Sequence, residues 1–544
     1  MSAPADDTSA AAGPWSPLRH RLFRWLWLAA IASNIGTWMH EVGAGWLMTS
    51  LANDPLLVSL VQAAGAAPMF ALALPAGALA DIVDRRCYLI GVQCWMAAVA
   101  LTLALLSHAN AMTPERLLAL TFALGIGSAL MAPAWAALTP ELVPAAELQP
   151  AVALSSVGIN VSRAIGPALA GLIVSSVGPW ATFALNATSF AGVILVLAAW
   201  RRTPTLAPLP AERFLGALRA GWRYARSAPA LQTVLVRAVA FFVFASAGLG
   251  LLPLLVRREL GGEAIVYGGL LTCVGVGAVA GAFVLPRLRQ RYPVDTLLAA
   301  ASLGYALVLC ALAGVHLLAL LVPVMLLAGA LWITALSSLQ VSAQTSAPAW
   351  VRARALAVYM LAFNGAMAGG AALWGALAAR QGLGVALFSA AAGLALAVPL
   401  LQRFRLAHHA AADLSPSLHW PAPIVGAEVE HDRGPVLITV EYSIASEDSA
   451  AFITAMQEVA RMRRRNGAIS WGLFQDTETP TRWLEFFIDE SWLEHLRHHG
   501  RVTRSEAACE ARVRALHRAA DGPRIRHHVA ADAAHRLPAV TGGH

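Results

Sequence analysis

Long apolar stretches separated by short polar turns cover most of the chain. Each stretch has about 20 residues, the length that a helix needs to cross the hydrocarbon core of a bilayer. The stretches lie at 23–49, 55–79, 87–107, 115–137, 150–175, 180–200, 232–256, 264–286, 295–314, 317–341, 354–378 and 383–402. The pattern therefore predicts an all-α membrane region with twelve spanning helices.

The second half of this region repeats the first at a constant offset of 204 residues. The matching positions are Arg85 and Arg289, Gly125 and Gly329, Pro144 and Pro348, Asn160 and Asn364, Gly166 and Gly370, and Gly171 and Gly375. A repeat in the same orientation needs an even number of spans in each half. We therefore expect two six-helix bundles, at 21–200 and 232–402, preceded by a mobile tail at 1–20.

The pattern changes after residue 402. Residues 403–433 form a linker rich in Ala, Pro and His, and 434–530 has the composition of a soluble domain. Periodicity predicts strands at 436–442, 468–474, 483–488 and 524–529, with helices at 446–465 and 491–517. This β-α-β-β-α-β order is that of a ferredoxin-like α+β domain. A mobile tail is expected at 531–544.

Composition supports a membrane protein and removes several other classes. The 544 residues are 58% hydrophobic and 13% charged, whereas soluble domains carry about 25% charged residues. The net charge of +8 does not indicate nucleic-acid binding, because the arginines lie between apolar stretches and not in one patch. The chain has no lysine, so it cannot contain the phosphate-binding loop of an ATP-driven pump. The five cysteines show no metal or redox spacing.

Arginine placement predicts the orientation of the chain. If both termini are cytoplasmic, the inner connections hold 18 arginines and the outer connections hold 4. This bias places both termini in the cytosol. The longest inner connection, 201–231, has Phe214, Leu218, Trp222 and Tyr224 among its arginines. It is therefore expected to be an amphipathic cytoplasmic linker that lies on the inner leaflet and joins the two bundles.

In the first span, Asn34, Thr37 and Glu41 fall on one helical face. An isolated carboxylate inside a span is costly, so Glu41 must be neutral, paired or in a water-filled cavity. We expect Asn34 and Glu41 to line a transport cavity and Glu41 to carry a coupling proton. The alternatives are that Glu41 only hydrates the outer end of the helix, or that it pairs with His40.

The fifth span places Asn160 and Arg163 on one face, followed by Gly166-Pro167 and by Gly171. An arginine at this depth needs an anion, a carboxylate partner or water. The Gly-Pro step bends the helix, and the small residues let a neighbouring helix approach. At the 204 offset Met367 stands opposite Arg163, so ionic roles are expected in the first half only.

The turn after the second span carries a sequence motif that resembles one from a known protein family. It reads Gly77-Ala78-Leu79-Ala80-Asp81-Ile82-Val83-Asp84-Arg85-Arg86, and it resembles the loop motif of the major facilitator superfamily. Ile82 and Asp84 depart from that motif, where a basic residue and a glycine are common. The resemblance implies a cytoplasmic gate formed by Gly77, Asp81, Arg85 and Arg86, in which Asp81 and an arginine latch the inner side.

The block in the fifth span is similar to one that exporters of this superfamily carry. The similarity implies that Asn160, Arg163, Gly166, Pro167 and Gly171 form an export motif, and that the fifth helix seals against the eighth. The small residues Gly275, Gly277 and Gly281 of the eighth span suit that contact. The alternative is that Gly-Pro is only a packing kink and that Arg163 is a structural tether.

Nearly the whole chain resembles a subfamily of bacterial exporters related to the enterobactin exporter, with an antibiotic-biosynthesis-monooxygenase-like extension at the C-terminus. The membrane part carries the likeness in Asn34, Trp38 and the 140–144 loop, and the extension carries it in 463–468 and 491–497. Extensions of this type tend to dimerise through their sheet. His495, His498 and His499 have spacing that could hold a metal or haem, but a solvated helix face is the favoured interpretation.

These observations predict a secondary active transporter in the bacterial inner membrane. We expect a proton-driven exporter of a small hydrophobic or siderophore-like solute, working by alternating access, with no cofactor, no metal and no catalytic residue. A homodimer through the C-terminal domain is a possible assembly. The alternative function is a membrane-anchored sensor or enzyme that acts through the C-terminal domain.

Overall fold

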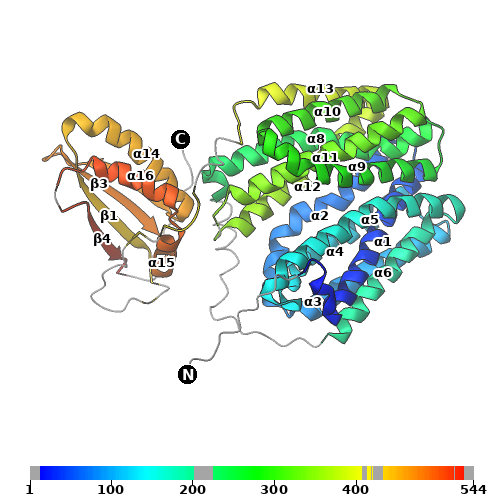
Figure 1. Ribbon diagram of the computed structural model, residues 1–544, viewed down its shortest axis with the longest axis horizontal. Helices are drawn as coiled ribbons and strands as arrows, with labels where there is room; N and C mark the ends of the chain where they lie inside the picture. The colour runs from blue at the N-terminus through cyan, green and yellow to red at the C-terminus, as the bar shows by residue number, and fades with distance from the viewer. Residues whose placement is uncertain are drawn as a thin grey trace. The chain divides into compact units, whose positions relative to one another are not determined.

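The computed structural model describes residues 13–200, 224–348, 350–406, 413–417, 419–420, 430, 433–519 and 521–531. The chain divides into two compact units (Figure 1). The first unit contains most of the long helices, and the second contains the C-terminal sheet with its own helices and short neighbouring segments.

Twelve long helices occur in the described residues, one for each predicted apolar stretch. The first half contains α1 (Arg21–Leu51), α2 (Pro55–Ile82), α3 (Arg85–His108), α4 (Pro114–Leu142), α5 (Leu148–Ser176) and α6 (Pro179–Ala199). The second half contains α8 (Pro229–Arg258), α9 (Ala264–Arg291), α10 (Val294–Gly314), α11 (Leu318–Thr345), α12 (Arg352–Gln381) and α13 (Leu383–Leu400). Proline at the first position starts α2, α4 and α6, because its missing N–H would have no helical partner there.

Eleven of these helices are long and apolar enough to cross a membrane, among the residues that the structure describes. The twelfth, α1, falls short because Asn34, His40 and Glu41 interrupt its apolar sequence. It nevertheless packs against α5 and α6 as part of the first bundle. The prediction of twelve spanning helices is therefore supported by composition for eleven of them, and α1 is present as a helix that is less apolar.

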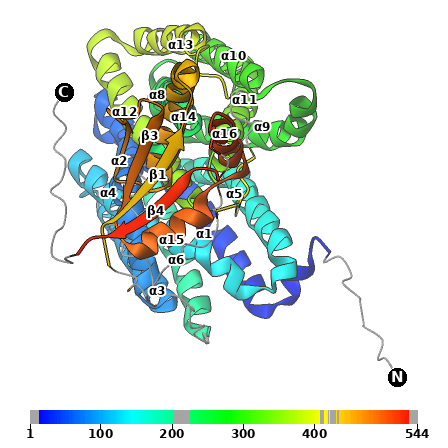
Figure 2. The same ribbon diagram turned by 90° about the vertical axis from the view of Figure 1, so that its left-hand side faces the viewer.

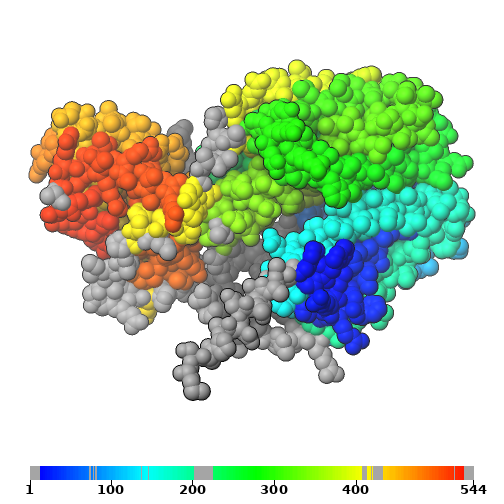
Figure 3. All heavy atoms as spheres, viewed as in Figure 1, coloured from blue at the N-terminus to red at the C-terminus, as the bar shows by residue number. Residues whose placement is uncertain are grey.

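The duplication is visible in local geometry. The Asn160 side chain donates a 2.8 Å hydrogen bond to the Ser156 carbonyl of its own helix, and Asn364 donates a 2.8 Å bond to the Met360 carbonyl. Gly125 of α4 lies against α2, and its counterpart in α11 lies against α9. In Figure 3 the blue-to-cyan atoms of the first half adjoin the green-to-yellow atoms of the second.

The halves meet through equivalent helices. A Cβ built on Gly171 of α5 would lie 2.9 Å from the Ala264 carbonyl oxygen of α9. Its counterpart Gly375, in α12, lies equally tightly against Leu56 and Ser59 of α2. Each half therefore presents its fifth helix to the second helix of the other half.

The C-terminal unit contains a four-stranded antiparallel sheet (Figure 2). Its elements are β1 (Val436–Ser443), α14 (Ser449–Asn466), β2 (Ser470–Gln475), β3 (Arg482–Asp489), α15 (Trp492–Arg501), α16 (Arg504–Ala515) and β4 (Arg524–Val529). The strands lie in the order β2-β3-β1-β4, and Ile438 pairs with Phe487 on one side and His527 on the other. Alternate residues of β1 and β3 face α14 and α16 and form the core with Phe452 and Met456.

The single helix predicted over 491–517 is in fact two helices. Val502 is extended and ends α15, and Thr503 starts α16 with a capping box in which Thr503 and Glu506 satisfy each other's backbone N–H groups. The break turns α16 onto the sheet, where Cys509 and Val513 are buried.

Several expected segments lie partly outside the described residues. Residues 1–12, 201–223, much of the 403–433 linker and 532–544 are in this group, including Phe214, Leu218 and Trp222. The stretch expected to be mobile up to residue 20 contains a 3-10 helix, η1 (Ser16–Arg19), in which Ser16 and Pro17 are buried.

Candidate functional site

Glu41 lies where helices from both halves come together. Its side chain is exposed although it lies ten residues inside the end of α1. The positive charge of Arg163 on α5 attracts the Glu41 carboxylate. The same carboxylate interacts electrostatically with Tyr267 of α9. Among the described residues no direct ion pair joins Glu41 to Arg163, so the two charges attract each other at longer range.

The Arg163 side chain packs against an aromatic ring. Its Nε atom is buried and has no hydrogen-bond partner within the described residues. The guanidinium carbon lies 5.5 Å from the centre of the Trp38 ring. Gly166, one turn later, allows this approach because a Cβ there would overlap the Trp38 side chain. Pro167 is buried in the same helix.

Of the other predicted polar residues, Asn34 is partly buried on α1 two turns before Glu41. Asn160 is occupied by its own helix, as described above. The structure does not support the alternative prediction that Glu41 pairs with His40. Within the described residues both of its ring nitrogens are buried without a hydrogen-bond partner, and the ring packs 5.1 Å from that of Phe183.

The predicted small-residue contact between α5 and α9 is present but is made by fewer glycines than expected. Gly275 of α9 lies against the backbone of Arg163. Gly277 and Gly281 instead lie against Leu326 and Ala330 of α11. Residues two positions apart point to different sides of a helix, so one glycine stripe serves two neighbours.

The predicted cytoplasmic gate is a turn of only two residues, Val83 and Asp84, so Arg85 and Arg86 belong to the first turn of α3. The Arg85 Nη1 atom lies 2.6 Å from Glu141 Oε1 at the end of α4, and Arg86 donates to the last carbonyls of α6.

Asp84, a departure from the superfamily motif, caps α3 by accepting a hydrogen bond from the Cys87 N–H. The predicted roles of Gly77 and of the Asp81 side chain fall outside what the structure describes.

Sequence reasoning missed the contacts that join the halves at one face. Arg257 at the end of α8 donates to the hydroxyls of Thr49 and Ser50 at the end of α1. Arg258 donates to the Asn53 carbonyl, and the Ile265 N–H donates to Ser175 Oγ. The signal was the Arg257-Arg258 pair itself, which stands out on the side predicted to be poor in arginine.

The C-terminal domain has a buried ionic network in its core. Arg463 Nε lies 3.0 Å from Glu485 Oε1, and Arg463 Nη1 lies 2.6 Å from Glu510 Oε1. Tyr442 and Trp471 also donate to Glu485. Burial alone would raise the pKa of Glu510, but the Arg463 charge and hydrogen bonds lower this pKa to about 2.

The expectation of a solvated histidine face on 495–499 was wrong. His495 and His498 are 0% and 1% exposed, because Asp489 at the end of β3 binds both of them. Burial lowers the pKa of His499 and of His527, each to about 4, so both rings are neutral near pH 7.

Comparison with known proteins agrees with this architecture. The sequence pattern of a family described as "Transmembrane secretion effector" matches residues 12–535. The Staphyloferrin A transporter of Staphylococcus aureus is 24% identical over 47% of this chain and 64% of its own length. The Enterobactin exporter EntS of Shigella boydii is 26% identical over 52% of this chain and 68% of its own. The match to the Staphyloferrin A transporter thus spans less than two thirds of that relative.

A solved structure shares the fold. A bacterial homologue of the human lysosomal transporter Spinster superposes with a TM-score of 0.54 at 16% identity, covering 73% of this chain and 96% of that one. The family match over nearly the whole chain, together with the two homologous helical halves, indicates a multi-pass membrane transporter. The chain belongs to the transmembrane secretion effector family of major facilitator transporters.

Proposed function

We propose that the protein is a proton-driven exporter of a small hydrophobic or siderophore-like solute, working by alternating access in the bacterial inner membrane with both termini in the cytosol. The observation that carries this proposal is Glu41, a carboxylate between the two halves that Arg163 attracts without a direct ion pair. A carboxylate so placed can exist in charged and neutral forms, and each form interacts differently with the arginine.

The contacts between the halves suggest how one state is held. Among the described residues, hydrogen bonds between the halves gather where α1, α5 and α8 end and α2 and α9 begin. With cytoplasmic termini this is the outer face, so the arrangement corresponds to an inward-open state. We infer that protonation of Glu41 weakens its attraction to Arg163 and changes the relative stability of the inward-open and outward-open states.

The names of the relatives supply the solute class. They include transporters named for siderophores and for a macrolide. A pocket for such solutes is lined mainly by apolar side chains and offers few polar groups that could recognise the solute. We therefore assign the pair of Glu41 and Arg163 to proton coupling and not to substrate selection.

Glu41→Gln tests the proton role. Inverted vesicles that contain the protein are energised, and uptake of enterobactin or of a macrolide, the solutes for which two relatives are named, is followed with and without a protonophore. We expect wild type and the control Glu115→Gln, an acid in the first turn of α4, to show protonophore-sensitive uptake. Glu41→Gln should lose it. Unchanged uptake by Glu41→Gln would retire the proton role, and insensitivity of wild type to the protonophore would retire proton drive.

For the C-terminal domain we propose a ferredoxin-like fold that dimerises through its open sheet face. The strand order β2-β3-β1-β4 supports the fold. On the side away from α14 and α16, Phe474 stacks on Phe486 beside Leu484, and Phe474 is 58% exposed. Such an apolar face suits a second copy of the same sheet.

Removal of residues 415–544 separates transport from a sensor or enzyme function of this domain. We expect efflux to persist, because the charged pair lies in the helices. Loss of all activity would favour the alternative function.

A further inference from the structure

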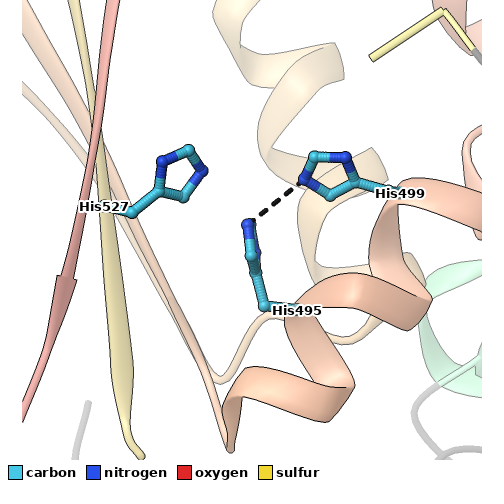
Figure 4. A group of neighbouring side chains, drawn as sticks. All are labelled: His495, His499 and His527. Carbon is cyan, nitrogen blue, oxygen red and sulfur yellow. Dashed lines mark hydrogen bonds between the residues drawn. The ribbon is translucent and has the colours of Figure 1, made fainter. Parts of the chain in front are cut away.

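Three histidines from two elements of the C-terminal domain converge on one point (Figure 4). His495 and His499 are four residues apart on α15 and so share one face. His527 reaches the same point from β4. One ring nitrogen from each of the three lies within 4.8 Å of the others. None of these residues belongs to the membrane site described above.

The distances suit a metal ion. Two nitrogens that each bind a tetrahedral zinc ion at about 2.0–2.1 Å lie about 3.3 Å apart. His495 Nε2 and His499 Nε2 are 3.2 Å apart. The rings of His495 and His527 are 4.8 Å apart between centroids, and the ligand nitrogens of all three histidines lie within 4.8 Å of one another, so His527 must shift to reach bonding distance. Two histidines at i and i+4 on one helix are a recurring zinc-binding arrangement.

A second observation points to the same ligand. Asp489 Oδ2 lies 2.9 Å from His495 Nδ1, which leaves Nε2 of that ring directed at the other two histidines. A carboxylate on the far nitrogen of a ligating histidine fixes the ring and strengthens it as a ligand. Asp489 is 1% exposed, so this orienting group is built into the core and is not a surface accident.

We propose that His495, His499 and His527 form a binding site for a divalent transition metal, with zinc as the reference ion and Asp489 as the residue that orients His495. Three imidazoles leave a fourth position for water or for a donor atom of a small molecule. Imidazole ligands of this kind favour zinc and its neighbours in the first transition series over magnesium or calcium.

The test uses the full chain in detergent, purified through a tag without histidines and stripped with a chelator. Equilibrium dialysis against zinc, with metal analysis, should give about one ion per chain. His499→Gln and His527→Gln should each weaken binding about 100-fold or more. The matched control is His528→Gln, because His528 is exposed and neighbours His527 on the opposite face of β4. It should bind like wild type.

Cobalt provides a second readout that does not depend on transport. Wild type and His528→Gln should give the visible absorption of four-coordinate cobalt, and the ligand variants should not. Asp489→Asn should keep the spectrum but bind about 10–100-fold more weakly. Hydrogen exchange over β1 and β3 reports whether each variant is folded. Substoichiometric binding by folded wild type, or equal binding by wild type and folded His527→Gln, would overturn the proposal.

Discussion

Arg163 in the membrane helices and Arg463 in the C-terminal domain are both placed where charge is costly, but their partners differ. Arg463 is fully engaged by Glu485 and Glu510 in direct contact. Within the described residues the Arg163 Nε atom has no hydrogen-bond partner, and Arg163 attracts Glu41 without a direct ion pair. A fully satisfied network holds one structure, whereas an incompletely satisfied one can respond to a proton or a solute. Arg463 therefore stabilises the fold of the domain, whereas Arg163 is the residue that we propose takes part in transport.

The largest effect on stability should follow removal of Arg463. Arg463→Met keeps much of the side-chain volume but leaves Glu485 and Glu510 buried without their counter-ion, which should cost the domain about 3–5 kcal/mol. Arg461→Met on the exposed face of α14 is the control and should change stability by less than about 0.5 kcal/mol. Denaturant-dependent hydrogen exchange over α14 and β3 measures both. Equal stability of the two variants would show that the network does not hold the domain together.

Acid should weaken the same network. Glu510 has a pKa of about 2 in the folded domain, against an ordinary value of 4.5. Its stabilisation is therefore complete above pH 4.5 and is lost as the pH falls toward 2, by about 3 kcal/mol in all. Hydrogen exchange of the domain at a series of pH values measures this loss. Glu510→Gln should flatten that part of the profile, and an unchanged slope would contradict the assignment.

A smaller effect is expected where the halves touch. Gly171→Ala places a Cβ 2.9 Å from the Ala264 carbonyl and 3.1 Å from the Ile265 Cα atom, neither of which can rotate away. The cost should be about 1–3 kcal/mol in the thermal unfolding of the detergent-solubilised protein. Gly192→Ala in α6 meets nothing within 4 Å and should be neutral or stabilising, by up to about 1 kcal/mol. If both variants unfolded at the same temperature, tight packing of α5 on α9 would be excluded.

The smallest change in stability should accompany a large loss of transport. Arg163→Met copies the residue that the second half has at this position. Because no direct ion pair joins Arg163 to Glu41 among the described residues, unfolding should change by less than about 1 kcal/mol. Transport in the vesicle assay should fall about tenfold or more, since this variant removes one of the two charges proposed for coupling. Normal transport by Arg163→Met would assign Arg163 to a tether only.

Sequence periodicity predicted the helices well because a bilayer imposes one length and one composition on every span. It also predicted α1, although Asn34, His40 and Glu41 make this helix less apolar than the other eleven. The strands were also found, β4 with its observed limits of 524–529. The break between α15 and α16 was present in the sequence as Thr503-Arg504-Ser505-Glu506, a capping-box pattern.

Sequence periodicity indicates which face of a helix or strand is buried, but not which other element packs against that face. Gly275 and Gly277 look alike in the sequence, yet one meets α5 and the other α11. His527 reaches His495 only because β4 pairs with β1 and β1 with β3, an order that depends on the whole sheet. Asp489 likewise joins His495 and His498 through the turn between β3 and α15. Such pairings depend on tertiary packing, and local spacing does not contain them.

The equivalent contacts of Gly171 with α9 and Gly375 with α2 have an evolutionary consequence. The fifth helix of each repeat contacts the second helix of the other repeat, so the same contact occurs twice. Such a surface is self-complementary and is related by a pseudo-twofold axis, which is the geometry of a symmetric dimer. A single six-helix ancestor could therefore have assembled with an identical partner through these glycines before gene fusion made the pair permanent. The two copies now differ in charge, since Met367 stands at the position that corresponds to Arg163.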